Sequence, residues 1–221
     1  MSQSPQSIEA AQLLLTAANA SKRARDGEYD LYVNHDPRKP WRAYCVLSEQ
    51  PPREYLVLHP DTRDTAQGGG NVSCALGLPD DLTLQVSTRW DRVRLSPQGL
   101  VAHTGDFTFA QVTANSATSG QSRTIAIPFG LAMDSVGAHS YSATSRIDLR
   151  GTPFSVHSEF CHGGTASAGG ATFSEQRQVV DICGGGMPGW CYVAKHCNDP
   201  DGIMGILGGG WHLELAYSGD V

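Results

Sequence analysis

The sequence predicts a mainly β fold, α+β at its margin, in which a short N-terminal helix is followed by a single multi-stranded, disulfide-containing β domain. Three observations predict this class. The 25 Gly and 12 Pro among 221 residues interrupt the chain too often for long helices. Short runs of alternating apolar and polar residues recur between turn signals. A hydrophobic content of 40% and six Cys suit a chain that buries its own core and crosslinks it.

The first predicted element is an amphipathic helix. Apolar residues at 8, 11, 15 and 18 follow Ser4-Pro5, which places a Ser cap before a Pro at the first helical position. The helix is expected to end near residues 22–25. Residues 1–7 are then a flexible N-terminus, and 8–221 form one domain, because the strand-like segments show no shift in composition along the chain.

The remaining elements are predicted as strands, because the hydrophobic period changes from helical spacing to two. The predicted strands cover 29–33, 42–47, 54–58, 82–86, 90–95, 107–112, 124–127, 146–149 and 211–217. The Gly-rich segments at 67–70, 163–170 and 184–186 are predicted as loops.

The charge pattern argues against two kinds of partner. Sixteen basic and 22 acidic side chains give a net charge of −6, so nucleic acid is not expected to bind. No segment approaches the ~20 apolar residues that a membrane-spanning helix needs. No signal peptide is visible, because the first basic residue, Lys22, follows the only apolar cluster near the N-terminus.

Familiar catalytic signatures are missing from the sequence. It contains no His-Glu-x-x-His zinc motif, no Gly-x-Ser-x-Gly elbow and no phosphate-binding Gly-x-x-x-x-Gly-Lys-Ser/Thr loop. An enzymatic activity is therefore not expected.

The cysteines can be read in two ways. In a Gly-rich β chain the six candidates for disulfide bonds are Cys45, Cys74, Cys161, Cys183, Cys191 and Cys197. The alternative is a zinc site, for which His157, Cys161 and His162 are the candidate ligands, together with the C-terminal cysteines. Disulfides indicate an oxidising compartment, and Asn71-Val72-Ser73 also fits an N-glycosylation acceptor.

One short segment is a candidate binding loop. Gly189 and Trp190 lie between Cys183 and Cys191, and a disulfide between those two cysteines would hold the loop rigid and lower the entropy cost of binding. The other Trp residues, at 41, 90 and 211, occupy strand-like positions that favour burial in the core.

Eight ordered blocks of sequence resemble the GON domain, which closes a subset of the secreted ADAMTS zinc metalloproteases. The blocks are Asp-Gly-Glu-Tyr-Asp-Leu-Tyr at 26–32, Tyr-Cys at 44–45, Pro-Arg-Glu-Tyr-Leu-Val-Leu at 52–58, Thr-Arg-Trp-Asp-Arg-Val-Arg-Leu at 88–95, Gly-Asp-Phe-Thr-Phe-Ala at 105–110, Pro-Phe-Gly-Leu-Ala-Met-Asp at 128–134, Arg-Ile-Asp-Leu-Arg-Gly-Thr at 146–152 and Asp-Ile-Cys-Gly-Gly at 181–185. Three family cysteines are missing: one in the leading helix, one after Asp134, where this chain has Ser135, and the partner of the latter before the Arg-Ile-Asp-Leu block. Cys45 is thereby left without its usual mate, for which Cys74 is the nearest substitute. The opening blocks are also similar to fibrinogen-like domains.

The resemblance implies a non-catalytic binding module at an extracellular or cell-surface location. Its partner would be a protein or an extracellular polymer. Two alternatives remain open: a zinc-binding domain or zinc-dependent hydrolase, and a fibrinogen-like ligand-binding lobe.

Overall fold

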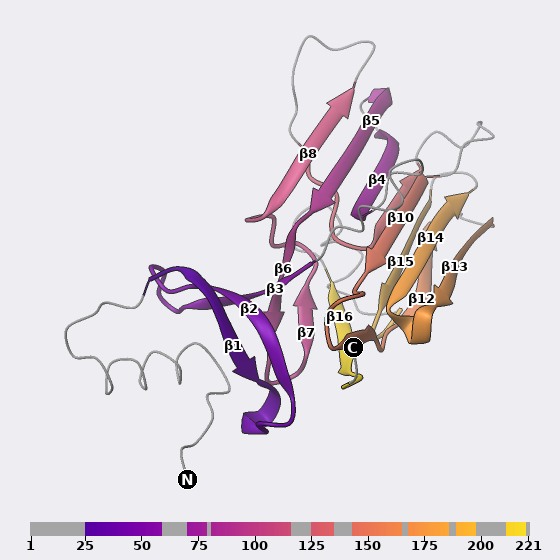
Figure 1. Ribbon diagram of the computed structural model, residues 1–221. Coiled ribbons are helices and arrows are strands. Elements are labelled where there is room, and N and C mark those ends of the chain that lie inside the picture. The colour runs from indigo at the N-terminus through magenta and orange to yellow at the C-terminus, as the bar shows by residue number, and fades with distance from the viewer. Residues whose placement is uncertain are drawn as a thin grey trace.

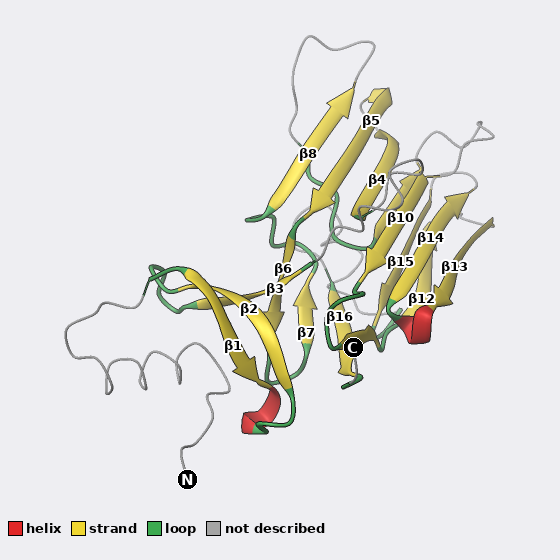
Figure 2. Cartoon of the chain, in the orientation of Figure 1, coloured by secondary structure: helices red, strands yellow, loops and turns green. Residues whose placement is uncertain are grey.

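A computed structural model describes residues 25–58, 70–78, 81–115, 125–134, 143–164, 168–185, 189–197 and 211–219. These residues form two antiparallel-rich sheets, which Figure 1 shows side by side. Strands supply nearly all of their regular structure, together with short 3-10 turns at Val33–His35 and Glu175–Arg177 (Figure 2). The predicted mainly β class is therefore confirmed. The predicted helix lies in residues 1–24, outside the described part.

The first sheet has seven strands in the order β1-β2-β3-β6-β7-β16-β11. Its members are β1 (Gly27–Tyr32), β2 (Pro40–Val46), β3 (Arg53–Val57), β6 (Arg92–Ser96), β7 (Val101–His103), β16 (His212–Tyr217) and β11 (Phe154–Val156). Buried and exposed side chains alternate along these strands. In β2, Trp41, Ala43 and Cys45 are buried, while Arg42 is exposed.

Side-chain contacts connect β2 with β11 and β16 across this sheet. The rings of Trp41 on β2 and Phe154 on β11 lie 5.7 Å apart, and Phe154 packs edge-on against Tyr217 of β16 at 5.8 Å. The Tyr217 hydroxyl donates a hydrogen bond of 3.2 Å to the carbonyl oxygen of Pro40. Aromatic contacts thus link the first and last parts of the sheet.

The second sheet has nine strands. Seven follow the order β12-β15-β9-β4-β10-β14-β13, while β5 pairs with β4 and β8 pairs with β5. Its members are β4 (Asn71–Leu78), β5 (Asp81–Trp90), β8 (Ala110–Asn115), β9 (Leu131–Asp134), β10 (Ala143–Asp148), β12 (Glu159–Gly164), β13 (Ala168–Ser174), β14 (Val179–Gly185) and β15 (Gly189–Ala194). The pairing of β4 with β9 is parallel, and it joins Cys74 to Ala132 in register.

Both faces of this second sheet are buried where β9 and β15 run through it. On β15, Cys191 and Val193 belong to the main core, whereas Tyr192 and Ala194 belong to a second apolar cluster with Trp211. All four residues of β9 are buried. The predicted burial of Trp41, Trp90 and Trp211 is confirmed, since each is at most 3% exposed.

Several predicted strands are confirmed and others need correction. β1, β2, β3, β5, β6, β10 and β16 fall where alternation predicted strands. Residues 125–128 pair in no strand; instead the Ile127 amide donates to Thr88 Oγ1 at 2.7 Å. The strand predicted at 107–112 begins only at Ala110, because its amide closes a turn onto the Phe107 carbonyl at 3.1 Å.

The described parts of two Gly-rich segments, 163–164 with 168–170 and 184–185, lie at strand ends, which corrects the prediction of loops for these residues. Gly163 pairs with Trp190, and Gly169 pairs with Gly184. At Gly163 a Cβ would lie 2.4 Å from Trp190 Nε1, so the absent side chain makes room for the indole. Glycine here allows close packing inside a sheet, whereas a glycine-rich composition alone predicts a loop.

The free edge of β11 is covered by a turn whose backbone adopts left-handed conformations. Glu175, Gln176 and Arg177 all have positive φ, of 51°, 54° and 67°. Such conformations cost about 1–2 kcal/mol per residue outside glycine. The turn brings Arg177 and Gln178 beside β11, where their side chains donate hydrogen bonds to four alternate carbonyls, those of Thr152, Phe154, Val156 and Ser158.

Within the part of the chain that the structure describes, no helix is both long enough and apolar enough to cross a bilayer.

Candidate partner-binding surface

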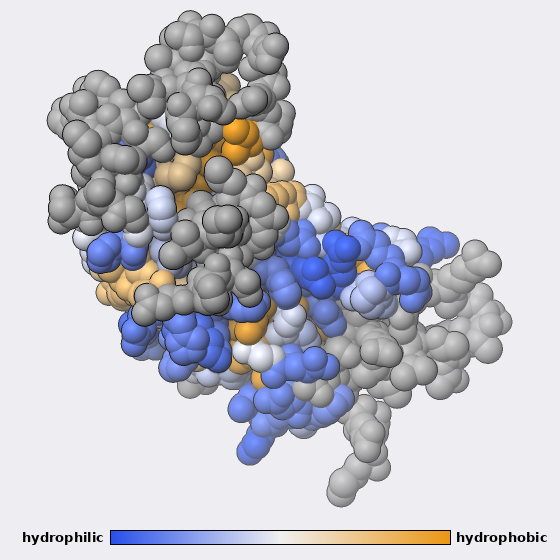
Figure 3. Space-filling model, turned by 180° about the vertical axis from the view of Figure 1, so that it is seen from behind, coloured by the Kyte–Doolittle hydropathy of each residue, from blue (hydrophilic) through white to orange (hydrophobic). Residues whose placement is uncertain are grey.

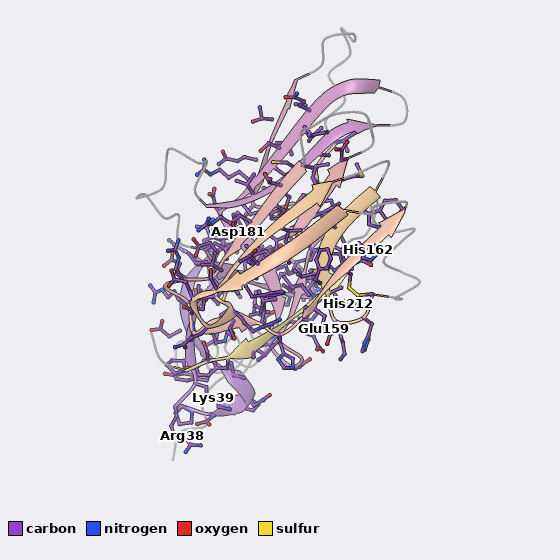
Figure 4. All side chains as sticks on the ribbon, turned by 90° about the vertical axis from the view of Figure 1, so that its right-hand side faces the viewer. Arg38, Lys39, Glu159, His162, Asp181 and His212 are labelled. Carbon is purple, nitrogen blue, oxygen red and sulfur yellow. A yellow bond between two sulfur atoms is a disulfide. The ribbon has the colours of Figure 1, made fainter. Side chains whose placement is uncertain are left out.

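The predicted zinc ligands do not assemble into a site. Cys161 on β12 forms a disulfide with Cys197, 36 positions later in the chain, and their Cα atoms lie 5.1 Å apart. Its sulfur is therefore not available to a metal in this structure. His162 follows Cys161 directly and so projects from the opposite face of β12, while His157 is exposed after β11. Figure 4 shows His162 and His212 as separate side chains. Among the described residues no group of three His, Cys, Asp or Glu is arranged to hold a metal ion.

Cys45 and Cys74 are both thiols, so Cys74 does not replace the missing mate of Cys45. Burial, with the Glu54 carboxylate adding to it, raises the pKa of Cys45 to about 12, which makes it a poor nucleophile at neutral pH. The side chain of Cys183 lies outside the described part, and a bridge from it to Cys191 is not among the described bonds.

The candidate loop residues Gly189 and Trp190 begin strand β15. Trp190 pairs with Gly163 on one side and with Met133 of β9 on the other. Its half-buried indole packs against the second apolar cluster. These contacts give Trp190 a packing role, and its part in binding stays a prediction.

A different group of residues forms the most organised surface on the first sheet. It combines three guanidiniums with aromatic rings and one carboxylate, and we call it the Arg–aromatic surface: Tyr44, Arg53, Tyr55, Arg92, Arg94, Asp106 and Phe109. Strands β2, β3 and β6 supply most of it, because Tyr44, Tyr55 and Arg94 stand side by side in register. The turn before β8 supplies Asp106 and Phe109.

Aromatic rings hold the central arginine. The guanidinium carbon of Arg92 lies 4.2 Å from the ring centre of Tyr44 and 4.7 Å from that of Phe109. Phe109 in turn packs edge-on against Tyr44 at 5.3 Å and Tyr55 at 4.8 Å. Arg92 Nε is buried with no hydrogen-bond partner among the described residues, where cation–π contacts surround the guanidinium instead.

A nearly buried carboxylate orients the two flanking arginines. The side chain of Asp106 is 9% exposed, and one of its oxygens lies 3.7 Å from Nη1 of both Arg53 and Arg94. Asp106 also accepts hydrogen bonds from the Thr108 hydroxyl at 2.7 Å and from the Tyr55 hydroxyl at 3.3 Å. Arg53 and Arg94 remain 36% and 32% exposed.

The charges of this surface do not cancel. Three guanidiniums face two carboxylates, Asp106 and Glu49, of which Glu49 pairs with Arg53 at 2.8 Å. One positive charge therefore remains on a chain whose net charge is −6. Such a local excess favours a partner that presents carboxylates, which arginine can bind in a bidentate manner.

A serine and a histidine meet at the margin of this surface. Ser96 Oγ lies 2.7 Å from Nε2 of His103. Burial, with Arg94 and His212 adding to it, lowers the pKa of His103. A nucleophile–base pair also needs a group that orients the base, and within the described ranges Ser96 is the one side chain hydrogen-bonded to His103. The pair is thus not a complete catalytic set.

The two ends of the molecule differ in polarity. Figure 3 shows hydrophobic residues gathered at the end formed by β4, β5 and β8, and hydrophilic residues over the end formed by β1 and β2. The Arg–aromatic surface includes β2 and so extends from this hydrophilic end.

Sequence reasoning missed the Arg–aromatic surface, although one signal was present. In the run from Arg92 to Leu95, the buried residues Val93 and Leu95 alternate with Arg92 and Arg94. That alternation places both arginines on the outer face of one strand.

Comparison with known proteins gave one match. The family model described as GON domain matches residues 15–198. No curated protein and no solved structure matches the chain significantly.

Proposed function

This chain belongs to the GON domain family, and on that premise we propose that it is a non-catalytic module that binds a protein partner. The family resemblance set out above implies an ancillary module of secreted proteins. The disulfide between Cys161 and Cys197 is in keeping with the oxidising environment outside the cell.

The observation that carries the proposal is the ordering of Arg92 between Tyr44 and Phe109. Arginine and tyrosine dominate the residues that contribute most to protein–protein affinity. An arginine already fixed by two rings loses less side-chain entropy when a partner binds. The arrangement therefore supports a pre-organised contact surface.

The positive charge of the Arg–aromatic surface indicates the charge of its partner. Arg53 and Arg94 share the carboxylate of Asp106 and keep part of their guanidiniums exposed. A partner segment with Asp or Glu side chains would supply further acceptors for these donors. We therefore propose an extracellular protein with an acidic segment.

The test compares two double variants that each remove two positive charges. Arg92→Ala with Arg94→Ala alters the surface, whereas Arg38→Ala with Lys39→Ala alters the tip of the β1–β2 hairpin, where Figure 4 shows both side chains away from the sheets. Each immobilised domain is incubated with conditioned medium from cells of its own source, and the retained proteins are quantified by mass spectrometry.

We expect the same proteins on the wild-type and hairpin variants, and at least about tenfold less of them on the surface variant. Raising the salt concentration should weaken retention, because the contact is ionic. Equal retention by all three domains, each shown to be folded, would refute the surface as the binding site.

A further inference from the structure

A cavity of about 340 Å³ lies where the first three strands approach the C-terminal strand. Asp30, Arg42 and Leu56 line it from β1, β2 and β3, and Pro153 and Tyr217 line it from the other side. Its volume falls within the range of about 300–1,000 Å³ that is typical of small-ligand sites. It shares no residue with the Arg–aromatic surface, although Val57 of its lining lies opposite Arg92 in the pairing of β3 with β6.

The polar groups of the cavity are arranged as a charged pair. Arg42 Nη1 donates a hydrogen bond of 2.9 Å to Asp30 Oδ1, and Arg42 Nε donates one of 3.1 Å to Glu28. Among the described hydrogen bonds, Asp30 Oδ2 and Arg42 Nη2 are not used. The wall therefore offers one acceptor and one donor to a ligand.

Two other polar groups of the lining are already occupied, whereas Trp41 Nε1 is buried with no hydrogen-bond partner among the described residues. The Tyr217 hydroxyl donates to the Pro40 carbonyl, and the Thr152 hydroxyl donates to the Leu149 carbonyl at 2.7 Å. The rest of the lining, which includes Leu56, Pro153 and Tyr217, is largely apolar. A fitting ligand needs an apolar face as well as a polar rim.

We propose that this cavity binds a neutral saccharide. A hydroxyl group both donates and accepts, so hydroxyls on one ring can meet the Asp30 carboxylate and the Arg42 guanidinium together. The C–H face of a pyranose ring suits the aromatic and proline side chains opposite. An anionic ligand fits poorly, because two carboxylates already share the single guanidinium of Arg42.

The test is a titration of the isotopically labelled chain by NMR. The probes are glucose, galactose, mannose, xylose, N-acetylglucosamine and N-acetylgalactosamine, each added up to about 50 mM, because a single small sugar is expected to bind with a dissociation constant on the order of 1 mM. The readout is the shift of the backbone amides of Asp30, Arg42, Thr152 and Gly219.

Three variants test whether the amide shifts come from binding in the cavity. Asp30→Asn removes the carboxylate charge, and Val57→Trp fills the cavity. Asp181→Asn is the matched control, because Asp181 pairs with Arg146 across strands at 3.2 Å just as Asp30 pairs with Arg42. Thermal melting checks that each variant is folded.

At least one sugar should shift these amides saturably in the wild type and in Asp181→Asn. The affinity should fall about tenfold in Asp30→Asn, since a hydrogen bond to a charged group is lost. Binding should vanish in Val57→Trp. The proposal is overturned if no sugar shifts the cavity amides, if Val57→Trp binds as the wild type does, or if N-acetyltyrosinamide binds there and the sugars do not.

The saccharide proposal and the proposed function can be refuted independently of each other. The Arg92→Ala, Arg94→Ala variant should bind the sugar as the wild type does. The Asp30→Asn variant should retain the partner protein of the Arg–aromatic surface.

Discussion

Arg177 Nε donates a hydrogen bond of 2.7 Å to the carbonyl oxygen of Val156, from outside the edge of the seven-stranded sheet. Its Nη2 reaches the Ser158 carbonyl at 2.6 Å, and Gln178 Nε2 reaches the carbonyls of Thr152 and Phe154. The side chains of two residues thus occupy every second carbonyl from Thr152 to Ser158, along β11 and the residues on either side of it. An edge strand covered in this way is a poor template for pairing with another chain.

The combined change Arg177→Ala and Gln178→Ala should therefore have two effects. The free energy of unfolding should fall by about 2 kcal/mol, because hydrogen bonds to the edge carbonyls are lost. The domain should also associate as its concentration rises, because the edge is open. Urea unfolding and light scattering measure the two effects. Arg38→Ala, a change at an exposed turn, is the control; a double variant as stable and as monomeric as this control would contradict the role of the turn.

Replacing Gly163 by Ala should destabilise the fold by about 2 kcal/mol, because the new Cβ would lie 2.4 Å from Trp190 Nε1 and the indole must move. The control is Gly170→Ala, where nothing lies within 4 Å of the Cβ position. Both are strand glycines in the same sheet. Chemical unfolding followed by tryptophan fluorescence reports the difference, and equal stability of the two variants would refute the close packing at Gly163.

Asn71 should carry no glycan, although Asn71-Val72-Ser73 fits an acceptor. The residue is 2% exposed, and its side-chain amide donates to the Asp148 carbonyl at 3.0 Å and accepts from the Asp148 backbone amide at 2.7 Å. Intact mass after expression in a secretory host checks this, and a glycan at Asn71 would contradict the burial.

The same residue should matter for stability. Asn71→Ala removes both hydrogen bonds and leaves two buried backbone groups of Asp148 without partners, so we expect a loss of about 3 kcal/mol. Gln111→Ala is the control, because its amide makes an exposed hydrogen bond to Asp91. A loss no larger than that of the control would show that the pairing contributes little.

Acidification should weaken the fold through His103. Burial, together with Arg94 and His212, lowers its pKa below the ordinary 6.5, while Ser96 holds Nε2 and the Asp106 carboxylate opposes the shift. The unfolded chain therefore takes up a proton that the folded chain resists. This contribution to stability is fully present above pH 6.5 and is lost as the pH falls towards the lower pKa of the folded state.

Urea unfolding at pH 7.5 and pH 5.5, values on either side of the ordinary histidine pKa, tests this behaviour. His103→Gln should lose less stability on acidification than the wild type, whereas His157→Gln, at an exposed position, should follow the wild type. An identical pH dependence in all three proteins would exclude His103 as the source.

Alternation predicted the strands that bury one face. Around Val93 and Leu95 the apolar period of two gave the position of β6 and the outward direction of Arg92 and Arg94. It failed for β9, whose four residues are all buried, because burial on both faces removes the alternation. It also failed at Gly163 and Gly169, where glycine serves packing inside a sheet.

The Arg–aromatic surface was beyond single-sequence reasoning for a different reason. Tyr44, Arg92 and Phe109 come from separate parts of the chain, and they meet only because β2, β3 and β6 are neighbours and the turn before β8 folds over them. Sequence shows the alternation within one strand. The pairing between distant strands is set by the whole core.

The position of β16 has a consequence for how the chain folds during synthesis. This strand lies between β7 and β11, and Tyr217 at its end reaches back across 177 positions to Pro40. The ribosome therefore delivers six strands of the sheet before the one that joins them. Until residues 212–217 leave the exit tunnel, β7 and β11 have no shared neighbour. The apolar residues around Trp41 and Phe154 are not yet covered by β16 at that stage. Completion of the sheet follows the synthesis of its other strands, and it depends on contacts between segments far apart in the sequence.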